Sequence, residues 1–233
     1  MKDYCEYISA ETLMGPCCIR ILDELFEKHP LQLPAGADVL DLGCGKGLTS
    51  LMTARETGAH VTAADLWISA EENTQRFASW GMDNCITPVH ADANGLPFEK
   101  AMFDAMVSVD SYHYYGGEKG FFEEKILPFM KNGAEILIGI PGIRSAYSGH
   151  SEELLADWLG EDSHMFKSAA QWKDILSGAD AVDDIEVWEM NCFDTPWDDW
   201  FNSGHEFAMG DKKFFDSLIK PFTCFIGIYM KLK

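Results

Sequence analysis

The sequence contains too little positive charge for a protein that binds nucleic acid or an anionic membrane. Its 18 Lys and Arg residues face 38 Asp and Glu residues, and the formal net charge is -20 at pH 7. A field of this sign repels phosphate backbones and anionic lipid surfaces. We therefore expect neither a nucleic acid nor a membrane as partner. The acidity either keeps the chain soluble or attracts a cationic substrate.

The chain also lacks the cysteine patterns of a disulfide-bonded or zinc-binding protein. It has no Cys-x-x-Cys pair and no Cys/His spacing of a zinc site. The N-terminus has no charged segment followed by an apolar one, and no apolar run approaches the ~20 residues of a membrane span. We expect free thiols, no metal site and a cytoplasmic location. The odd number of cysteines comprises Cys5, Cys17, Cys18, Cys44, Cys85, Cys192 and Cys224.

Strand and helix patterns alternate along the first two thirds of the chain. The 233 residues, of which 47% are hydrophobic, suit one α/β domain. Strict alternation favours a doubly wound, mostly parallel sheet, which strands near the C-terminus would extend to seven. The expected strands are 39–42, 60–64, 86–90, 103–110, 135–140, 185–190 and 223–232; the expected helices are 19–29, 48–57, 69–80, 121–130 and 169–176.

We expect a single domain over 1–233 with three parts. An N-terminal helical cap occupies 1–33, the core of the sheet occupies 34–143, and a substrate-side half occupies 144–233. Within that half, 191–221 is too long for the hairpin that joins neighbouring strands, so it predicts an ordered insertion.

Three glycines at alternate positions follow the first strand. That strand ends in Asp41, and Gly43, Gly45 and Gly47 come just before a helix. Such a loop lets the backbone approach a ligand closely. The dinucleotide fingerprint Gly-x-Gly-x-x-Gly would need a third glycine where Leu48 stands.

This motif resembles the first motif of the class I S-adenosylmethionine-dependent methyltransferases, and the resemblance extends roughly over 39–140. It implies a Rossmann-like methyltransferase fold, S-adenosylmethionine as cofactor, S-adenosylhomocysteine as product and a small-molecule methyl acceptor. S-adenosylmethionine carries a sulfonium cation where a dinucleotide carries an anionic pyrophosphate. Asp41 is then expected near the positive groups of the cofactor.

Residues after the second and third strands fit the same resemblance. It implies that Asp65 accepts hydrogen bonds from the ribose hydroxyls. Leu66 and Trp67 are expected to flank the adenine, while Asp92 and the backbone N–H of Ala93 contact its amino group. The alternatives are local ones: Asp65 caps a helix, and Asp92 bonds its own backbone in a turn.

An aromatic stretch, 110–117, begins where the fourth strand ends. Its first residue, Asp110, is expected to line the cofactor pocket. Tyrosine faces attract a sulfonium cation, and histidine suits proton removal near neutral pH. We predict His113 as the base when the acceptor still holds a proton, with Tyr112 or Tyr114 orienting the substrate. The alternative is that His113 only bonds a backbone carbonyl.

Two further segments are candidates to cover the ligands. One lies near the N-terminus and the other in the insertion, where the aromatic residues form either a lid or a satellite core. Their members are Tyr7, Met14, Gly15 and Pro16 in the first segment, and Trp197, Trp200 and His205 in the second.

Two other functions stay open on the sequence. A nicotinamide-dependent oxidoreductase has glycines and an acidic residue at similar positions after its first two strands. Leu48 argues against this function, because it stands where the third glycine of the dinucleotide motif would be. A module that binds S-adenosylmethionine without catalysis is the other. A lipid-like acceptor is open too, but no basic lipid-docking helix supports it. The fold does not choose among oxygen, nitrogen, sulfur and carbon acceptors, and the oligomeric state is undetermined.

Overall fold

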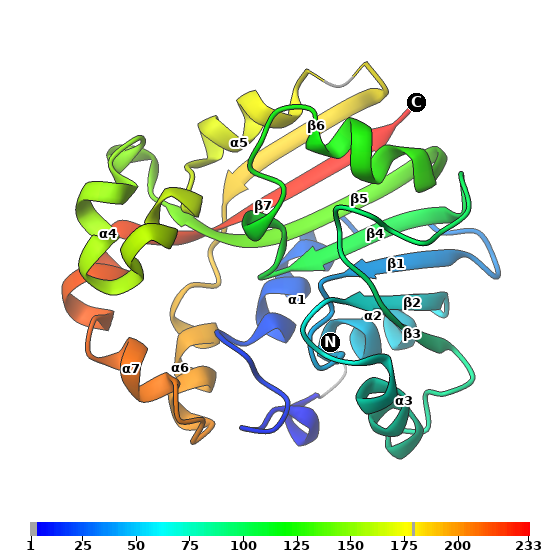
Figure 1. The fold of residues 1–233 in the computed structure, drawn as a ribbon, viewed down its shortest axis with the longest axis horizontal. Helices are drawn as coiled ribbons and strands as arrows, with labels where there is room; N and C mark the ends of the chain where they lie inside the picture. The colour runs from blue at the N-terminus through cyan, green and yellow to red at the C-terminus, as the bar shows by residue number, and fades with distance from the viewer. Residues whose placement is uncertain (1–3, 179) are drawn as a thin grey trace.

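The computed structural model describes residues 4–178 and 180–233, which form a seven-stranded sheet covered by helices on both faces (Figure 1). The strand order is β3-β2-β1-β4-β5-β7-β6. This confirms the expected α/β class and the mostly parallel sheet. The strands are β1 Asp38–Leu42, β2 His60–Asp65, β3 Ile86–His90, β4 Phe103–Val109, β5 Met130–Ile143, β6 Val182–Glu189 and β7 Thr223–Leu232.

Alternate residues of each strand face opposite layers of helices. Val39 belongs to one core cluster, with residues of α1, α2, α3 and α6, whereas Leu40 belongs to the other, with Phe122 and residues of α5. The sheet is therefore buried on both faces, as a doubly wound sheet requires. The helices are α1 Cys18–Lys28, α2 Leu48–Thr57, α3 Ala70–Ser79, α4 Ser151–Leu159, α5 Ala169–Leu176, α6 Asp194–Asn202, α7 Ala208–Lys212 and α8 Lys220–Phe222.

Shorter helical turns fill the remaining connections. Two are π-helical, Phe122–Ile126 and Phe215–Ile219, and the rest are 3-10 turns. The 3-10 turns are Cys5–Tyr7, Tyr112–Tyr114, Leu127–Phe129, Ser145–Tyr147 and Gly160–Met165.

The order of the strands reverses between β1 and β4. The chain winds outward from β1 through β2 to β3 and then returns to pair β4 in parallel with β1. Ligands of open α/β sheets bind outside the carboxyl ends of the strands at such a reversal. The helices α4, α6 and α7 lie together beyond the carboxyl ends of β4 and β5 (Figure 1).

The fifth strand is longer than the sequence predicts. It runs from Met130 to Ile143, through Pro141, and pairs in antiparallel fashion with β7. The amide of Asp110, just after β4, donates a hydrogen bond to the carbonyl of Gly139 at 2.7 Å. This is the last bond of the ladder between β4 and β5. Pro141 faces the same side two residues later, where β4 has ended, so its missing N–H removes no ladder bond.

Three other expectations need correction. The helix expected over 121–130 is a short π-helix followed by a 3-10 turn at Pro128, and then β5 begins. The sixth strand begins at Val182, three residues earlier than expected. The segment 151–165, for which no element was expected, forms α4 and a 3-10 turn.

The insertion 191–221 folds as α6, α7, a π-helical turn and α8. Trp197 and Trp200 are 3% and 1% exposed and pack in the same core cluster as Phe225. Trp200 also contacts the ring of His205, with ring centroids 4.8 Å apart. Trp197 and Trp200 therefore pack in the main core on this face of the sheet and not in a satellite core, and neither they nor His205 lines the pocket. None of the helices in 4–178 and 180–233 is long and apolar enough to span a membrane.

Candidate functional site

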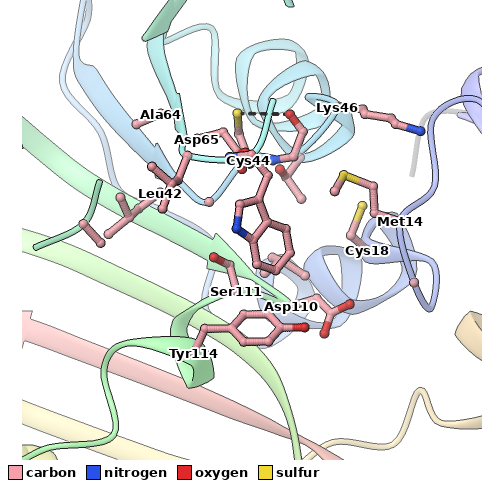
Figure 2. A pocket seen from close by; sticks show the side chains of 18 of the residues that line it. Met14, Cys18, Leu42, Cys44, Lys46, Ala64, Asp65, Asp110, Ser111 and Tyr114 are labelled. Atoms are coloured by element: carbon pink, nitrogen blue, oxygen red, sulfur yellow. Dashed lines mark hydrogen bonds between the residues drawn. The ribbon is translucent and has the colours of Figure 1, made fainter. Parts of the chain in front are cut away.

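A cavity of about 350 Å³ opens at the carboxyl ends of β1, β2, β3 and β4 (Figure 2). It lies at the reversal of the strand order, and most of the predicted cofactor residues line it. By segment, the lining comprises 12–16 and Cys18, then 42–46, 48 and 49, then 64–67, then 91–94, and finally 109–111, 114 and 115.

The glycine loop has the backbone conformation that its sequence requires. Gly43, Gly45 and Gly47 have positive φ angles of 74°, 52° and 82°. A Cβ on Gly43 would lie 1.8 Å from Oγ of Ser111, and one on Gly47 would lie 2.3 Å from Cε1 of Phe77. Glycine is required at both positions by conformation and by space.

Most of the loop amides are hydrogen-bonded within the chain. Gly43 and Cys44 donate to the carbonyl of Ala64 at 2.8 and 3.1 Å, and Gly47 donates to Cys44 at 2.9 Å. The Gly45 amide donates to Oδ2 of Asp65 at 2.8 Å. Four of the five amides in 43–47 are thus engaged, whereas a diphosphate cradle needs such amides to face the ligand.

The position of Asp41 corrects the expectation of direct cofactor contact. The side chain is fully buried, and its residue is not part of the cavity lining. Its Oδ2 accepts from Thr49 and Ser50 at 2.6 and 2.5 Å, while burial raises its pKa to about 6 despite these bonds. Asp41 therefore fixes the start of α2 against the tip of β1 and acts on the pocket through the loop.

Asp65 lines the cavity and organises the loops around it. Its Oδ1 accepts from the amides of Trp67 and Ile68, both at 2.8 Å, and its Oδ2 accepts from Gly45. One carboxylate thus joins the loop after β1 to the loop after β2. The helix-capping alternative does not apply, because Ser69 caps α3 in a capping box.

The residues that the sequence predicts to contact the adenine all line the cavity. Leu66 and Trp67 are 49% and 65% exposed and line it, as do Asp92 and Ala93. Asp92 also makes the turn bond that was its alternative role, since its Oδ1 accepts from the Asn94 amide at 2.8 Å. The hydrogen bonds from Asn94 lower the pKa of Asp92.

Only part of the aromatic stretch reaches the cavity. Tyr114 lines it and meets Trp67 edge-on, with ring centroids 5.2 Å apart. Tyr112 and His113 are 0% and 5% exposed and lie outside the lining, which corrects their predicted catalytic placement. Burial also lowers the pKa of His113 to about 3, so its imidazole is a weak base. The 3-10 turn 112–114 directs only its last residue to the ligand side.

Asp110 lines the cavity at the carboxyl end of β4. Its φ of 55° is rare for a residue other than glycine, and asparagine and aspartate tolerate it best. Burial, reinforced by the nearby carboxylate of Asp211, raises its pKa to about 7. Figure 2 shows Tyr114 and Asp110 on the same side of the pocket, with Met14 and Cys18 beside Asp110.

Several lining residues were not among the predicted site residues. Ser111 bonds the hydroxyl of Tyr115 at 3.3 Å, and that hydroxyl reaches the carbonyl of Leu42 at 3.4 Å. Both belong to the aromatic stretch, so the sequence signal was present but unassigned. Cys18 and Lys46 also line the cavity. Of the expected N-terminal cap, Met14, Gly15 and Pro16 line it and Tyr7 does not.

Residues 39–125 match the methyltransferase domain family. The chain is 34% identical over 93 residues to methyltransferase GfsG of Streptomyces halstedii, covering 40% of this chain and 33% of that protein. It is 35% identical over 121 residues to the demethylmenaquinone methyltransferase of Clavibacter sepedonicus, covering 48% and 47%. The chain thus spans less than half the length of these two curated relatives.

The fold as a whole resembles a solved methyltransferase. The geranyl diphosphate C-methyltransferase of Streptomyces coelicolor A3(2), solved with S-adenosyl-L-homocysteine bound, superposes with a TM-score of 0.72 at 16% identity, covering 90% of this chain and 78% of the other. At this identity the likeness concerns the fold alone. Other relatives of the matched segment are named for acceptors as different as sarcosine and ribosomal RNA. The shared segment therefore does not determine the acceptor.

Proposed function

We propose that this chain, which belongs to the class I S-adenosylmethionine-dependent methyltransferases, transfers a methyl group to a small molecule. One observation carries the proposal: the cavity joins the glycine loop to Asp65, Asp92 and Asp110, and four of the five amides of that loop are already bonded within the chain. An uncharged adenosine and a cationic sulfonium suit such a site, whereas a diphosphate does not.

The residues at the β2 and β3 side of the cavity fit an adenosine. The carboxylate of Asp65 is held in place by three backbone amides and keeps one lone pair, on Oδ2, for a ribose hydroxyl. The exposed faces of Leu66 and Trp67 offer an apolar surface to the adenine base. Asp92, beside Ala93, supplies an acceptor for its amino group.

The β4 side of the cavity fits the reacting end of the cofactor and the acceptor. Bound S-adenosylmethionine supplies an activated methyl group, so the protein mainly has to align an acceptor with it. Tyr114 and Trp67 meet edge-on in the lining and offer aromatic faces to a bound cation. Asp110 places a carboxylate beside the positive charge of the cofactor.

We infer a small-molecule acceptor from the size and charge of the site. A cavity of about 350 Å³ is in the size range of small-molecule sites. The net charge of -20 opposes an RNA acceptor, although some relatives are named as RNA methyltransferases. Seven free thiols support a reducing compartment, and we place the protein in the cytoplasm.

Methyl transfer from a labelled donor tests the proposal. Purified protein is incubated with methyl-labelled S-adenosylmethionine and a small-molecule fraction of cell extract, and labelled products are identified by mass. We expect a labelled small molecule together with S-adenosylhomocysteine. Donor binding with no labelled product from any fraction would instead indicate a binding module without catalysis.

A further inference from the structure

The charges that line the cavity are unevenly distributed. Among the described residues of the lining, Lys46 is the only one with a positively charged side chain. Three carboxylates also line it, those of Asp65, Asp92 and Asp110, at or just after the ends of β2, β3 and β4. S-adenosylmethionine carries the opposite set of charges, because its sulfonium and ammonium groups are cationic and its α-carboxylate is its one anionic group.

The ammonium group of Lys46 is not committed to a partner within the chain. Over residues 4–178 and 180–233 it forms neither an ion pair nor a hydrogen bond. Burial, together with the nearby guanidinium of Arg76, lowers the pKa of Lys46, while Glu11 and Glu72 act in the opposite direction. Glu72 is already engaged, because its Oε2 accepts from the Ser69 amide at 3.2 Å in the capping box of α3. A partly desolvated, unpaired ammonium gains from a bound anion.

The backbone amide of Lys46 is a second donor at the same place. It is the one amide of 43–47 that makes no hydrogen bond to another described residue, since the other four are bonded within the chain. The loop leads directly into α2, whose N-terminus has no side-chain cap at Gly47 and carries a partial positive charge. One amide and one ammonium suit a single carboxylate, whereas a diphosphate needs several loop amides.

Lys46 lies at the rim of the pocket, where the N-terminal segment packs on the glycine loop. The sulfur of Met14 is 3.0 Å from the position that a Cβ on Gly45 would take, and Figure 2 shows the Lys46 side chain on the Met14 side of the pocket. A carboxylate bound at the rim keeps part of its hydration. The flexible four-carbon stem of lysine, which no ion pair restrains here, lets the ammonium follow that carboxylate.

We propose that Lys46 binds the α-carboxylate of the methyl donor and thereby makes the site selective for donors that carry this group. The inference rests on the proposed function. The ammonium supplies a charge-assisted hydrogen bond to the carboxylate, and the backbone amide of the same residue supplies a second one. Decarboxylated S-adenosylmethionine, which keeps the sulfonium and the amine, leaves both donors without an anion. The site therefore discriminates between two donors that offer the same methyl group.

The other charges of the protein favour the opposite choice. Removing the carboxylate makes a ligand more positive, and the three carboxylates of the lining attract a more positive ligand. The net charge of -20 acts in the same sense at longer range. A preference for the carboxylate-bearing ligand thus requires a local positive group that outweighs these charges, and Lys46 is the group of that kind in the lining.

Two ligands that differ only in the carboxylate test the inference. The full chain is titrated by calorimetry with S-adenosylhomocysteine and with its decarboxylated form, which keeps the adenosine, the sulfur and the amine. We expect S-adenosylhomocysteine to bind about tenfold more tightly. Equal binding of the two, or tighter binding of the decarboxylated form, overturns the inference. Failure of both ligands to bind would instead refute the proposed function, and the inference with it.

Variants locate the preference. Lys46→Gln removes the charge and keeps the backbone amide, so the ratio of the two affinities should fall to about twofold or invert. Lys100→Gln is the matched control, because it removes the same charge from an exposed turn outside the lining and should keep the wild-type ratio. A Lys46→Gln protein with the wild-type ratio overturns the assignment, even if both ligands bind more weakly, because Lys46 would then support the loop and not the carboxylate.

Discussion

Replacing Gly43 by alanine places a methyl group where the structure has no room for one. The new Cβ would lie 1.8 Å from Oγ and 2.4 Å from Cβ of Ser111, on the loop that follows β4. The left-handed backbone at a φ of 74° costs about 1–2 kcal/mol for alanine, and forcing Ser111 away costs about 1–3 kcal/mol more. Ser111 lines the pocket, so its displacement moves the wall of the donor site.

Gly58→Ala is the matched control for this change. Gly58 has a φ of 72° at the C-terminal end of α2, and no atom lies within 4 Å of the position that a Cβ would take there. It should lose only the backbone contribution, about 1–2 kcal/mol, and lower the melting temperature by roughly 2–4 °C per kcal/mol. We expect at least about tenfold weaker S-adenosylhomocysteine binding by Gly43→Ala and none of that loss in Gly58→Ala.

A second substitution separates the clash from the strain. Ser111→Gly removes both atoms that the new methyl group meets, so the double variant should recover most of the donor affinity but not the backbone contribution. Calorimetry and thermal unfolding measure the two effects. A Gly43→Ala protein with wild-type donor affinity, or a double variant without recovery, would refute the reasoning about the loop.

Three further predictions concern the groups around the pocket. His113→Asn should leave the methyl-transfer rate and its pH profile unchanged, because His113 lies outside the lining with its pKa lowered to about 3. A changed pH profile would return it to the mechanism. Asp110→Asn should stabilise the chain more at pH 8 than at pH 4. The pKa of Asp110 is raised from 3.8 to about 7, so the folded chain binds its proton more tightly, and the free energy of unfolding falls as pH rises through that window. Thermal melts across pH that show no such difference would contradict the burial of this charge. Trp197→Ala should cost about 3–5 kcal/mol of stability, measured by denaturant unfolding, with little change in donor affinity below the transition. A selective loss of donor binding would make Trp197 part of the pocket.

The features that could be predicted from the sequence are those fixed by local chemistry. The positive φ angles of Gly43, Gly45 and Gly47 follow from their positions after an apolar strand, and the helix Leu48–Thr57 ends at Gly58 as predicted. The α/β class and the mostly parallel seven-stranded sheet follow from the alternation of elements, and the family resemblance follows from the glycine pattern. The match of 39–125 to the methyltransferase domain confirms the family.

The features that could not be predicted depend on partners distant in the sequence. Which residue of Tyr112–Tyr114 reaches the ligand is set by how the 3-10 turn packs, so His113 ranked high by chemistry and yet lies outside the lining. Asp41 was assigned to the cofactor because its hydroxyl partners on α2 carry no sequence signal. The bonds that Asp211 of α7 accepts from Trp158 of α4 and Trp200 of α6 likewise join segments that only the fold brings together.

The most direct test of the account is the binding of cofactors to the purified wild-type chain. Calorimetric titration with S-adenosylhomocysteine, S-adenosylmethionine and a nicotinamide dinucleotide compares a sulfur-linked adenosine with a diphosphate in one site. We predict binding of the first two and none of the dinucleotide, because four of the five amides of the glycine loop are already bonded within the chain. Binding of the dinucleotide alone would contradict it.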